Sequence, residues 1–350
     1  MISSAEDVVS RNMSMGEYLR RRYEQTTRAL ACRARSEQEW LAWREAFRRK
    51  LMELMAPWPE PYPLHPITLE RVQRDGFVQE KVLFNSEADM AVPAYVLIPD
   101  TYDGSSRYPV LVCQHGHGNG KDDVVGIAHG THAQWLVVQQ TRYDYAAALA
   151  RRGYVAVAMD ARGFGERALG YTCGGENGCN MVQVKAQLLG LNLLTLNVFD
   201  LSRCIDYLTL RPEVDPQRIG CVGLSYGGTL TLFSAALDER IKVAVVSGYL
   251  SSLYEQTFVR GDSCGSQIVP NLARWGELSD VACLVAPRAL LIESGTEDDM
   301  FGIDAARAAF QEMHRLYEVL TVPEKAAHHV FVGGHRWDGA RTAAWLEQWL

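Results

Sequence analysis

The chain has 350 residues, of which 47% are hydrophobic and 22% are charged, and its formal net charge is −7. A chain of this length and composition can bury a substantial core, and its acidic balance argues against a nucleic-acid partner. No apolar run approaches the roughly 20 residues of a membrane span, and the first residues lack the basic and apolar segments of a secretory signal. We therefore expect a cytoplasmic protein without a membrane partner, whose eight cysteines stay reduced.

The first 66 residues are predicted to form a helical extension. Ser36 and Glu39 have the spacing of a capping box, in which two side chains satisfy free N–H groups at the start of a helix. Large apolar residues then recur at steps of three and four, which places them on one helix face: Trp40, Trp43, Phe47, Leu51 and Leu54. Five prolines between residues 57 and 66 end the helix. We expect residues 1–66 to pack through this apolar face against a main domain of residues 67–350.

From residue 67 onward, short apolar segments alternate with helical ones. Strands are predicted at residues 69–72, 82–84, 94–98, 110–113, 154–159, 219–222, 243–246 and 289–292. Helical periodicity marks residues 141–152, 183–209, 226–237 and 304–320. This alternation indicates an α/β fold with a mostly parallel central sheet flanked by helices. In such a sheet the reactive groups lie in loops at the carboxyl ends of the strands.

A glycine-rich loop, residues 115–120, follows the predicted strand 110–113. Such a loop can point a backbone N–H, here that of His117, at a developing negative oxygen, which is the task of an oxyanion hole. His115 and His117 could alternatively chelate a metal, but we find no third ligand at a recognisable spacing and predict no metal. His115 is expected to be a structural residue beneath the loop.

A second glycine-rich loop, residues 163–168, fits G-x-G-x-x-A after a strand and could bind a dinucleotide. The acidic residue expected about 20 positions later is missing, because residues 186–189 are Ala-Gln-Leu-Leu. We therefore predict no organic cofactor.

Ser225 lies in the sequence Gly-Leu-Ser-Tyr-Gly-Gly, between the strand 219–222 and the helix 226–237. G-x-S-x-G in this context is typical of a nucleophile elbow, whose tight turn needs glycine on both sides and projects the hydroxyl from the sheet. The backbone N–H of Tyr226, the next residue, would be the second oxyanion donor.

The serine needs a base, and in this strand-turn-helix arrangement the partners follow in the order serine, acid, histidine. His335 lies in a loop after a short apolar strand, whereas His314 lies within a helix and His328 and His329 are placed before that strand, at its wrong end. We therefore predict His335 as the base. The acid lies in the loop that follows the strand 289–292, where Asp298 is our choice and three rivals stay open from spacing alone: Glu293, Glu297 and Asp299.

Taken together, these segments resemble the dienelactone-hydrolase and acetyl-xylan-esterase branch of the α/β-hydrolase superfamily. The resemblance is carried by His115–Gly118, Asp160–Arg167, Gly223–Gly228, Ala286–Asp298 and Gly333–His335, and spans roughly residues 40–350. It implies the α/β-hydrolase fold and a triad of Ser225, Asp298 and His335 in a catalytic domain of residues 67–350. It also implies that Arg162 and Phe164 border the active site. The family often has proline one and four residues after the acid, where this chain has Asp299 and Gly302.

The sequence indicates the reaction more clearly than the substrate. Trp135, Trp275 and Trp337 are candidates for an aromatic wall that binds a sugar ring or an apolar acyl group, or they are core residues. Residues 249–283 are expected to lie over the carboxyl edge of the sheet as a lid or a pocket wall.

We predict a serine esterase acting through an acyl-enzyme on a small-molecule acetyl-type or carbohydrate ester. The alternatives are a peptidase of the prolyl-oligopeptidase type and a non-catalytic binding protein on a hydrolase scaffold. The sequence is also compatible with a homo-oligomer.

Overall fold

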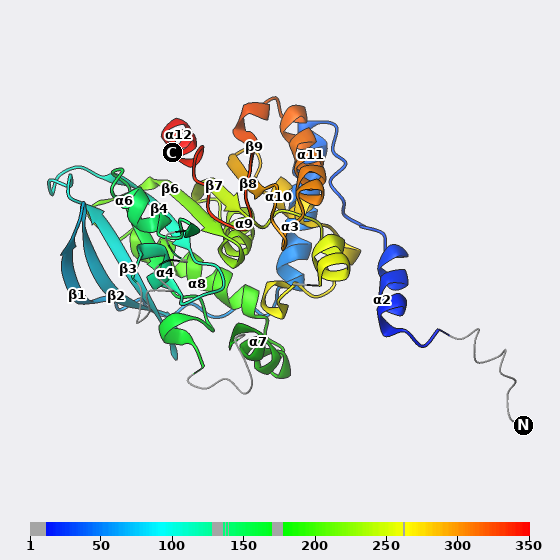
Figure 1. The fold of residues 1–350 in the computed structure, drawn as a ribbon, viewed down its shortest axis with the longest axis horizontal. Coiled ribbons are helices and arrows are strands. Elements are labelled where there is room, and N and C mark those ends of the chain that lie inside the picture. Colours follow the sequence, from blue (N-terminus) through cyan, green and yellow to red (C-terminus); the bar gives the residue numbers. More distant parts are fainter. Residues whose placement is uncertain (1–11, 128–135, 137, 139, 170–177, 262) are drawn as a thin grey trace, which may run out of the picture.

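The chain folds around one nine-stranded sheet with helices on both faces (Figure 1). This computed structural model describes residues 12–127, 136, 138, 140–169, 178–261 and 263–350. The strand order is β1-β2-β3-β5-β4-β6-β7-β8-β9. The strands are β1 (Ile67–Arg74), β2 (Phe77–Glu87), β3 (Met90–Pro99), β4 (Tyr108–Gln114), β5 (Val155–Met159), β6 (Val214–Leu224), β7 (Ile241–Ser247), β8 (Ala289–Gly295) and β9 (Ala326–Phe331).

The sheet is mixed, with a parallel part that carries the loops of interest. The pairs β1–β2, β2–β3 and β3–β5 are antiparallel, whereas the strands from β5 through β4, β6, β7 and β8 to β9 run parallel to one another. The predicted mostly parallel sheet flanked by helices is therefore confirmed. One expectation was wrong: His328 and His329 do not precede the last strand but lie within β9, where they pair with Ile292 and Glu293.

Helices cover both faces of the sheet because strand side chains alternate between two cores. Val110 and Val112 belong to one core and Leu111 and Cys113 to the other. The first core includes residues of α3, α8, α9, α10 and α11, and the second includes residues of α4, α6 and α12. The helices are α2 (Met15–Glu24), α3 (Glu37–Leu54), α4 (Lys121–Val125), α6 (Tyr145–Ala150), α7 (Gly178–Leu188), α8 (Leu193–Leu208), α9 (Tyr226–Leu237), α10 (Leu278–Cys283), α11 (Ile303–Val319) and α12 (Thr342–Trp349). Shorter helical turns are η1 (Gly165–Arg167), η2 (Glu255–Arg260), η3 (Gly265–Gln267), η4 (Leu272–Arg274) and η5 (Pro323–Lys325).

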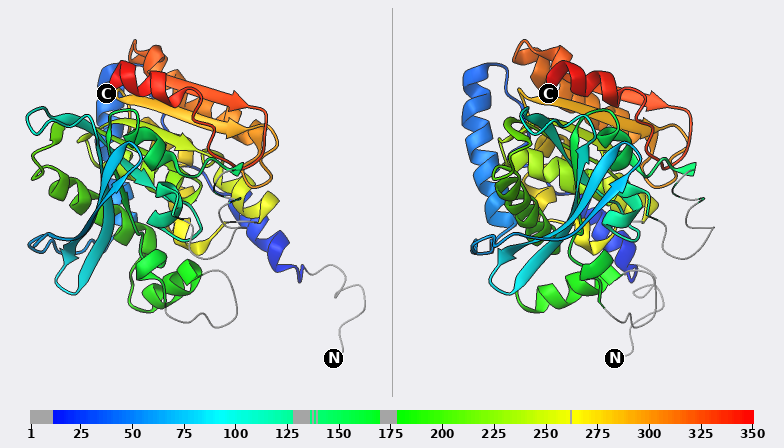
Figure 2. Two further views of the ribbon diagram at one scale, coloured as in Figure 1. Left: turned by 60° about the vertical axis from the view of Figure 1, so that its left-hand side comes forward. Right: turned by 90° about the vertical axis from the view of Figure 1, so that its left-hand side faces the viewer.

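The helix α3 carries the predicted apolar stripe and runs along one flank of the molecule (Figure 2, right-hand view). The Ser36 side chain caps it by accepting a hydrogen bond from Glu39 N, while the Glu39 carboxylate accepts from Arg35 N, one residue before the expected position. Phe47 and Leu51 are fully buried in the same core as the sheet. The extension therefore shares its core with the main domain. The predicted helix 183–209 is in fact two helices, since Asn192 caps the start of α8.

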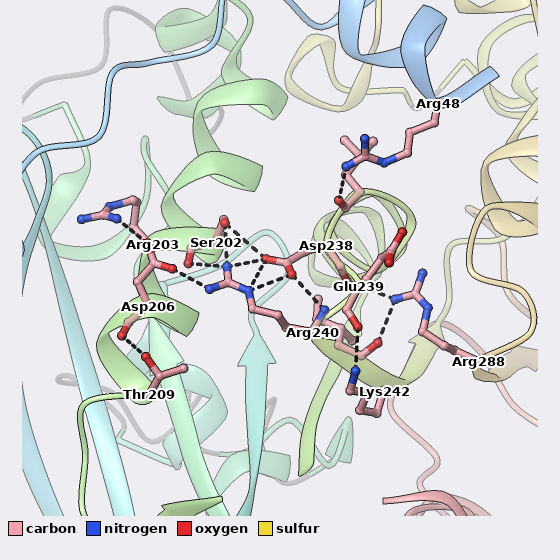
Figure 3. Close-up of polar contacts among 12 residues, drawn as sticks. Arg48, Ser202, Arg203, Asp206, Thr209, Asp238, Glu239, Arg240, Lys242 and Arg288 are labelled. Carbon is pink, nitrogen blue, oxygen red and sulfur yellow. Dashed lines mark hydrogen bonds and ion pairs between the residues drawn. The ribbon is translucent and has the colours of Figure 1, made fainter. Parts of the chain in front are cut away.

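A network of polar side chains lies at the amino ends of the parallel strands, opposite their carboxyl ends (Figure 3). Arg240, at the start of β7, bonds Asp238 at the end of α9 and Asp206 on α8. Arg48 of α3 donates to the carbonyl of Leu237, which ties the N-terminal helix to the same turn. This network fixes the C-terminal end of α9, the helix that carries the candidate nucleophile at its other end.

No single helix in the described ranges has the length and apolar character needed to cross a membrane. Among the described residues, the pair α7 and α8 passes that test when the two helices are taken together, and their axes are bent by 102° to each other.

Phe47 tests how far the extension contributes to the core. Its ring is stacked on Trp43 and lies against Gly276, where an added Cβ would approach the ring to 2.5 Å. Replacing a buried phenylalanine by alanine lowers the free energy of unfolding by about 3–5 kcal/mol. We expect Phe47→Ala to lower the free energy of unfolding in urea by that amount. Leu41→Ala, at an exposed position of the same helix, should change it by less than about 0.5 kcal/mol; equal effects would contradict a shared core.

His328 should make the fold sensitive to acid. Burial, and then the charges of Arg307 and His329, lower the pKa of His328 to about 4, below the roughly 6.5 of an unfolded chain. Between these two values the unfolded chain binds a proton that the folded chain does not, so stability falls as the pH drops from about 6.5 to 4, by on the order of 3 kcal/mol. Urea unfolding across this range should show that loss reduced in His328→Gln and kept in His314→Gln. An unchanged loss in His328→Gln would contradict the assignment.

Candidate active site

Ser225 sits on a sharp turn between β6 and α9. Its backbone has φ 61° and ψ −121°, a left-handed conformation that a residue other than glycine adopts only when its surroundings enforce it. An added Cβ at Gly223 would lie 2.3 Å from the Gly227 carbonyl, and one at Gly227 would lie 2.0 Å from the Gln114 carbonyl. Both positions of the G-x-S-x-G sequence therefore need glycine. The turn holds the serine at the carboxyl end of the central strand β6, at the N-terminus of α9.

His335 and Asp298 form a hydrogen-bonded pair at the ends of the neighbouring strands. His335 Nδ1 lies 2.8 Å from Asp298 Oδ2, and Asp298 Oδ1 accepts the backbone N–H groups of Met300 and Phe301 at 2.9 Å. Burial alone would raise the pKa of Asp298, but the His335 ring and the two N–H groups bring it below its usual value. The carboxylate is thus charged and fixed before any ligand binds.

The rival acids take other positions. Glu297 and Asp299 are exposed, whereas Asp298 is 5% exposed. Glu293 is fully buried in β8 and accepts a hydrogen bond from Thr342 Oγ1 of α12 instead of one from His335. Burial raises its pKa. Of the four acids only Asp298 hydrogen-bonds the predicted base.

The imidazole of His335 lies beside the elbow. An added Cβ at Gly248 would lie 2.9 Å from His335 Cε1 and 3.0 Å from Leu224 Cδ1, the residue before Ser225. The Ser225 N–H donates to the carbonyl of Ser247, which precedes Gly248. The ring is also stacked on Phe301, with centroids 5.5 Å apart. His335 Nε2 is buried and has no hydrogen-bond partner within the described part of the chain. His335 Nε2 makes no hydrogen bond to Ser225 in this structure, and hydrogen bonds of this kind often tighten only in the complex with substrate.

The loop after β4 is held close to the serine. An added Cβ at Gly116 would lie 3.1 Å from Ser225 Cβ, and the Gly116 N–H donates to the Tyr143 hydroxyl at 2.6 Å. His115 lies beneath the loop, fully buried. Its Nε2 accepts from Ala161 N at 3.0 Å, which leaves Nδ1 as the donor to the Gly116 carbonyl. Burial lowers the pKa of His115, which is consistent with this neutral form.

Two carboxylates fix the other half of the loop. Asp123 accepts from both the backbone and the side chain of Asn119. Asp160 pairs with the buried Lys121, 2.8 Å from its Nζ, and accepts its backbone N–H. The loop is therefore preorganised. The N–H groups of His117 and Tyr226 make no hydrogen bond to any described part of the protein, which leaves them available to a ligand.

The other predicted site residues have mixed surroundings. Phe164 forms an aromatic cluster with His117 and Tyr226, with ring centroids 5.3–5.5 Å apart. Arg162 instead is 8% exposed, and its guanidinium pairs with the buried Asp200 and with Glu87. It is held in a structural ion-pair network, and we do not assign it to substrate binding.

Two tryptophans likewise have packing contacts. Trp337 is 5% exposed and stacked on Tyr145 at 4.5 Å. Trp275 packs against the extension, with Lys50 Nζ 4.3 Å from its ring centroid. We assign both to packing. Trp135 lies outside the described residues.

Several positions that shape the site were missed from the sequence. Tyr143 and Asp123 orient the loop after β4, and Gly248 makes room for the His335 ring. None of them belongs to a recognisable motif. Only the position of Gly248 directly after the strand β7, at the carboxyl edge, could have drawn attention to it.

Comparisons with known proteins show the family to which the chain belongs. A model of the Abhydrolase family matches residues 10–341. The chain belongs to that family. Its relative YtaP of Bacillus subtilis, assigned as a hydrolase, is 26% identical over 319 residues, which cover 87% of this chain and 98% of YtaP.

Solved structures of similar fold are a Bacteroides fragilis protein assigned as an acetyl xylan esterase and a glucuronoyl esterase from Solibacter usitatus. The first has a TM-score of 0.77 at 21% identity and covers 94% of this chain and 84% of that one. The second has a TM-score of 0.68 at 14% identity, and the match covers 93% of this chain and 98% of that one. The predicted α/β-hydrolase fold and the resemblance to acetyl xylan esterases are thereby confirmed.

Gly227 tests the close packing on which the elbow depends. Gly227→Ala would push a methyl group against the Gln114 carbonyl, and overpacking of this kind costs about 1–3 kcal/mol. We expect a loss of that size in urea unfolding, together with loss of reactivity at Ser225 toward a fluorophosphonate. Gly16→Ala, where the nearest atom to the new Cβ is 3.9 Å away, is the control: it should keep the reactivity of Ser225, and because Gly16 lies in helix α2 it should not lower the free energy of unfolding. A reactive, fully stable Gly227→Ala would contradict this geometry.

Proposed function

We propose that the protein is a serine carboxylic-ester hydrolase that works through an acyl-enzyme intermediate. The observation that carries the proposal is the His335 imidazole, which is bonded to a buried carboxylate through Nδ1 and keeps a buried, unbonded Nε2 beside the Ser225 elbow. An imidazole held in this way is prepared to accept the proton of a neighbouring hydroxyl.

In the proposed first half-reaction, Ser225 Oγ attacks the ester carbonyl carbon while His335 Nε2 takes the hydroxyl proton. Asp298 holds the ring in the tautomer with Nδ1–H and stabilises the imidazolium. The negative oxygen of the tetrahedral intermediate accepts hydrogen bonds from the N–H groups of His117 and Tyr226. When the intermediate collapses, the C–O bond to the alcohol breaks and His335 returns the proton to the departing oxygen.

In the second half-reaction a water molecule replaces the alcohol. His335 Nε2 takes a proton from the water, whose oxygen attacks the acyl carbon. Collapse of this intermediate releases the carboxylic acid, and the proton returns to Ser225 Oγ. Every step uses protein groups and water only.

For the substrate we propose an ester of a carbohydrate with a small acyl group such as acetate. The support is that solved structures of similar fold include proteins described as acetyl xylan esterases and as glucuronoyl esterases. Acetylated xylo-oligosaccharides, methyl glucuronate esters and dipeptide amides are the panel that separates acyl, uronate and peptide substrates.

The proposed nucleophile is tested by Ser225→Ala. We expect the turnover of p-nitrophenyl acetate to fall by about 10³-fold or more, because the acyl-enzyme cannot form, while the free energy of unfolding changes little. Ser234→Ala is the matched control, since Ser234 is also buried on α9 and its hydroxyl has no partner among the described residues. Equal activity in the two variants would contradict the proposal. Hydrolysis of amides but of no ester by the wild-type protein would instead indicate a peptidase.

A further inference from the structure

Three metal-binding side chains from distant parts of the chain meet next to the candidate active site. His117 comes from the loop after β4, Cys179 from the first turn of α7, and Cys264 from the residue before η3. The possible ligand atoms of all three lie within 4.8 Å of one another, and the two Sγ atoms are 3.5 Å apart. Within the described ranges this is the only group of three or more histidine, cysteine or acidic side chains found close enough to hold an ion.

These separations suit a tetrahedral ion. Zinc binds thiolate sulfur at about 2.3 Å and imidazole nitrogen at about 2.0 Å, so neighbouring ligand atoms in a tetrahedral site lie about 3.5–3.8 Å apart. The three side chains could therefore reach this geometry by small rotations. Two thiolates and an imidazole are a soft donor set, which selects zinc-like ions over magnesium or calcium. A site with three protein ligands keeps a fourth position for water or another ligand.

The surroundings of Cys264 favour its metal-binding form. The fully buried Ser266 donates a hydrogen bond from Oγ to Cys264 Sγ at 3.1 Å, as outer groups do around metal ligands. Cys179 is 1% exposed, whereas His117 is exposed, so an ion can enter from the side of the imidazole.

The His117 side chain has no part in the hydrolysis proposed above, which uses only its backbone N–H. Its ring contacts Phe164 and Tyr226 at the edge of the cluster. An ion bound to the imidazole and to both thiolates would tie the loop after β4 to α7 and to η3.

We propose that His117, Cys179 and Cys264 form a binding site for a zinc-class divalent cation, with an open fourth position. The site goes beyond the proposed ester hydrolysis and does not depend on it. The ion takes no part in attack on the ester. It holds the oxyanion loop against the segments that carry the two cysteines.

Cobalt(II) absorption tests the site directly, because cobalt bound to thiolate gives a charge-transfer band and tetrahedral cobalt gives strong visible bands. Reduced, metal-free full-length protein should show both after addition of one equivalent of cobalt, and zinc should abolish them. Zinc should also raise the thermal midpoint of unfolding. Cys264→Ser and Cys179→Ser should lose the charge-transfer intensity and bind zinc at least tenfold more weakly.

The control variant is Cys32→Ser. Cys32 interacts with the Cys283 thiol. The Cys32→Ser variant therefore removes one member of a second pair of thiols, one that has no histidine beside it. This variant should keep the cobalt bands. His117→Gln should weaken zinc binding. Because the His117 side chain is exposed, this variant should fold, and it tests the site even if a cysteine variant fails to fold.

The proposal is overturned if wild-type protein gives no cobalt–thiolate band, if the band keeps its full intensity in Cys264→Ser, or if His117→Gln binds zinc as tightly as the wild type. It is equally overturned if the reduced protein binds no cobalt and peptide mapping finds a Cys179–Cys264 disulfide once the reductant is removed. Each of these results is independent of esterase activity, which can fail or succeed separately.

Discussion

The close approach of two backbones, at Gly227 on α9 and Gln114 at the end of β4, is the constraint on which the candidate site depends. The 2.0 Å that would separate an added Cβ from the Gln114 carbonyl leaves room for no side chain. This contact brings the elbow of Ser225 directly under the loop that starts at His115. The nucleophile and its expected oxyanion donors therefore come from neighbouring parallel strands, whose register fixes them relative to each other. Further along the sheet, the loops that follow the parallel strands β8 and β9 bring Asp298 into hydrogen-bonding contact with His335.

The parts of this arrangement that depend on local chemistry could be predicted from the sequence. The glycines around Ser225 are required by the turn itself, and the alternation of apolar strands with helices follows from a sheet covered on both faces. The capped helix α3 could be predicted for the same reason, because its apolar stripe and its N-cap are close together in sequence.

The parts that depend on distant contacts could not be predicted. Four acids lie in or near one loop, and only the path of the chain after β8 turns Asp298 toward His335 while Glu293 is bonded to α12. Arg162 looks like a substrate ligand in sequence, but two carboxylates from other elements neutralise it in the core. The partners of His117 among the cysteines are 62 and 147 residues away, so no spacing rule could have joined them.

The central claim is that Ser225 is a nucleophile activated by the buried His335–Asp298 pair. It is tested most directly by treating the intact protein with a fluorophosphonate and locating the adduct by mass spectrometry. The account predicts one adduct, on the peptide that contains Ser225, formed at least a thousandfold more slowly in His335→Gln. An adduct on another residue, or labelling of Ser225 at the same rate without the imidazole, would contradict it.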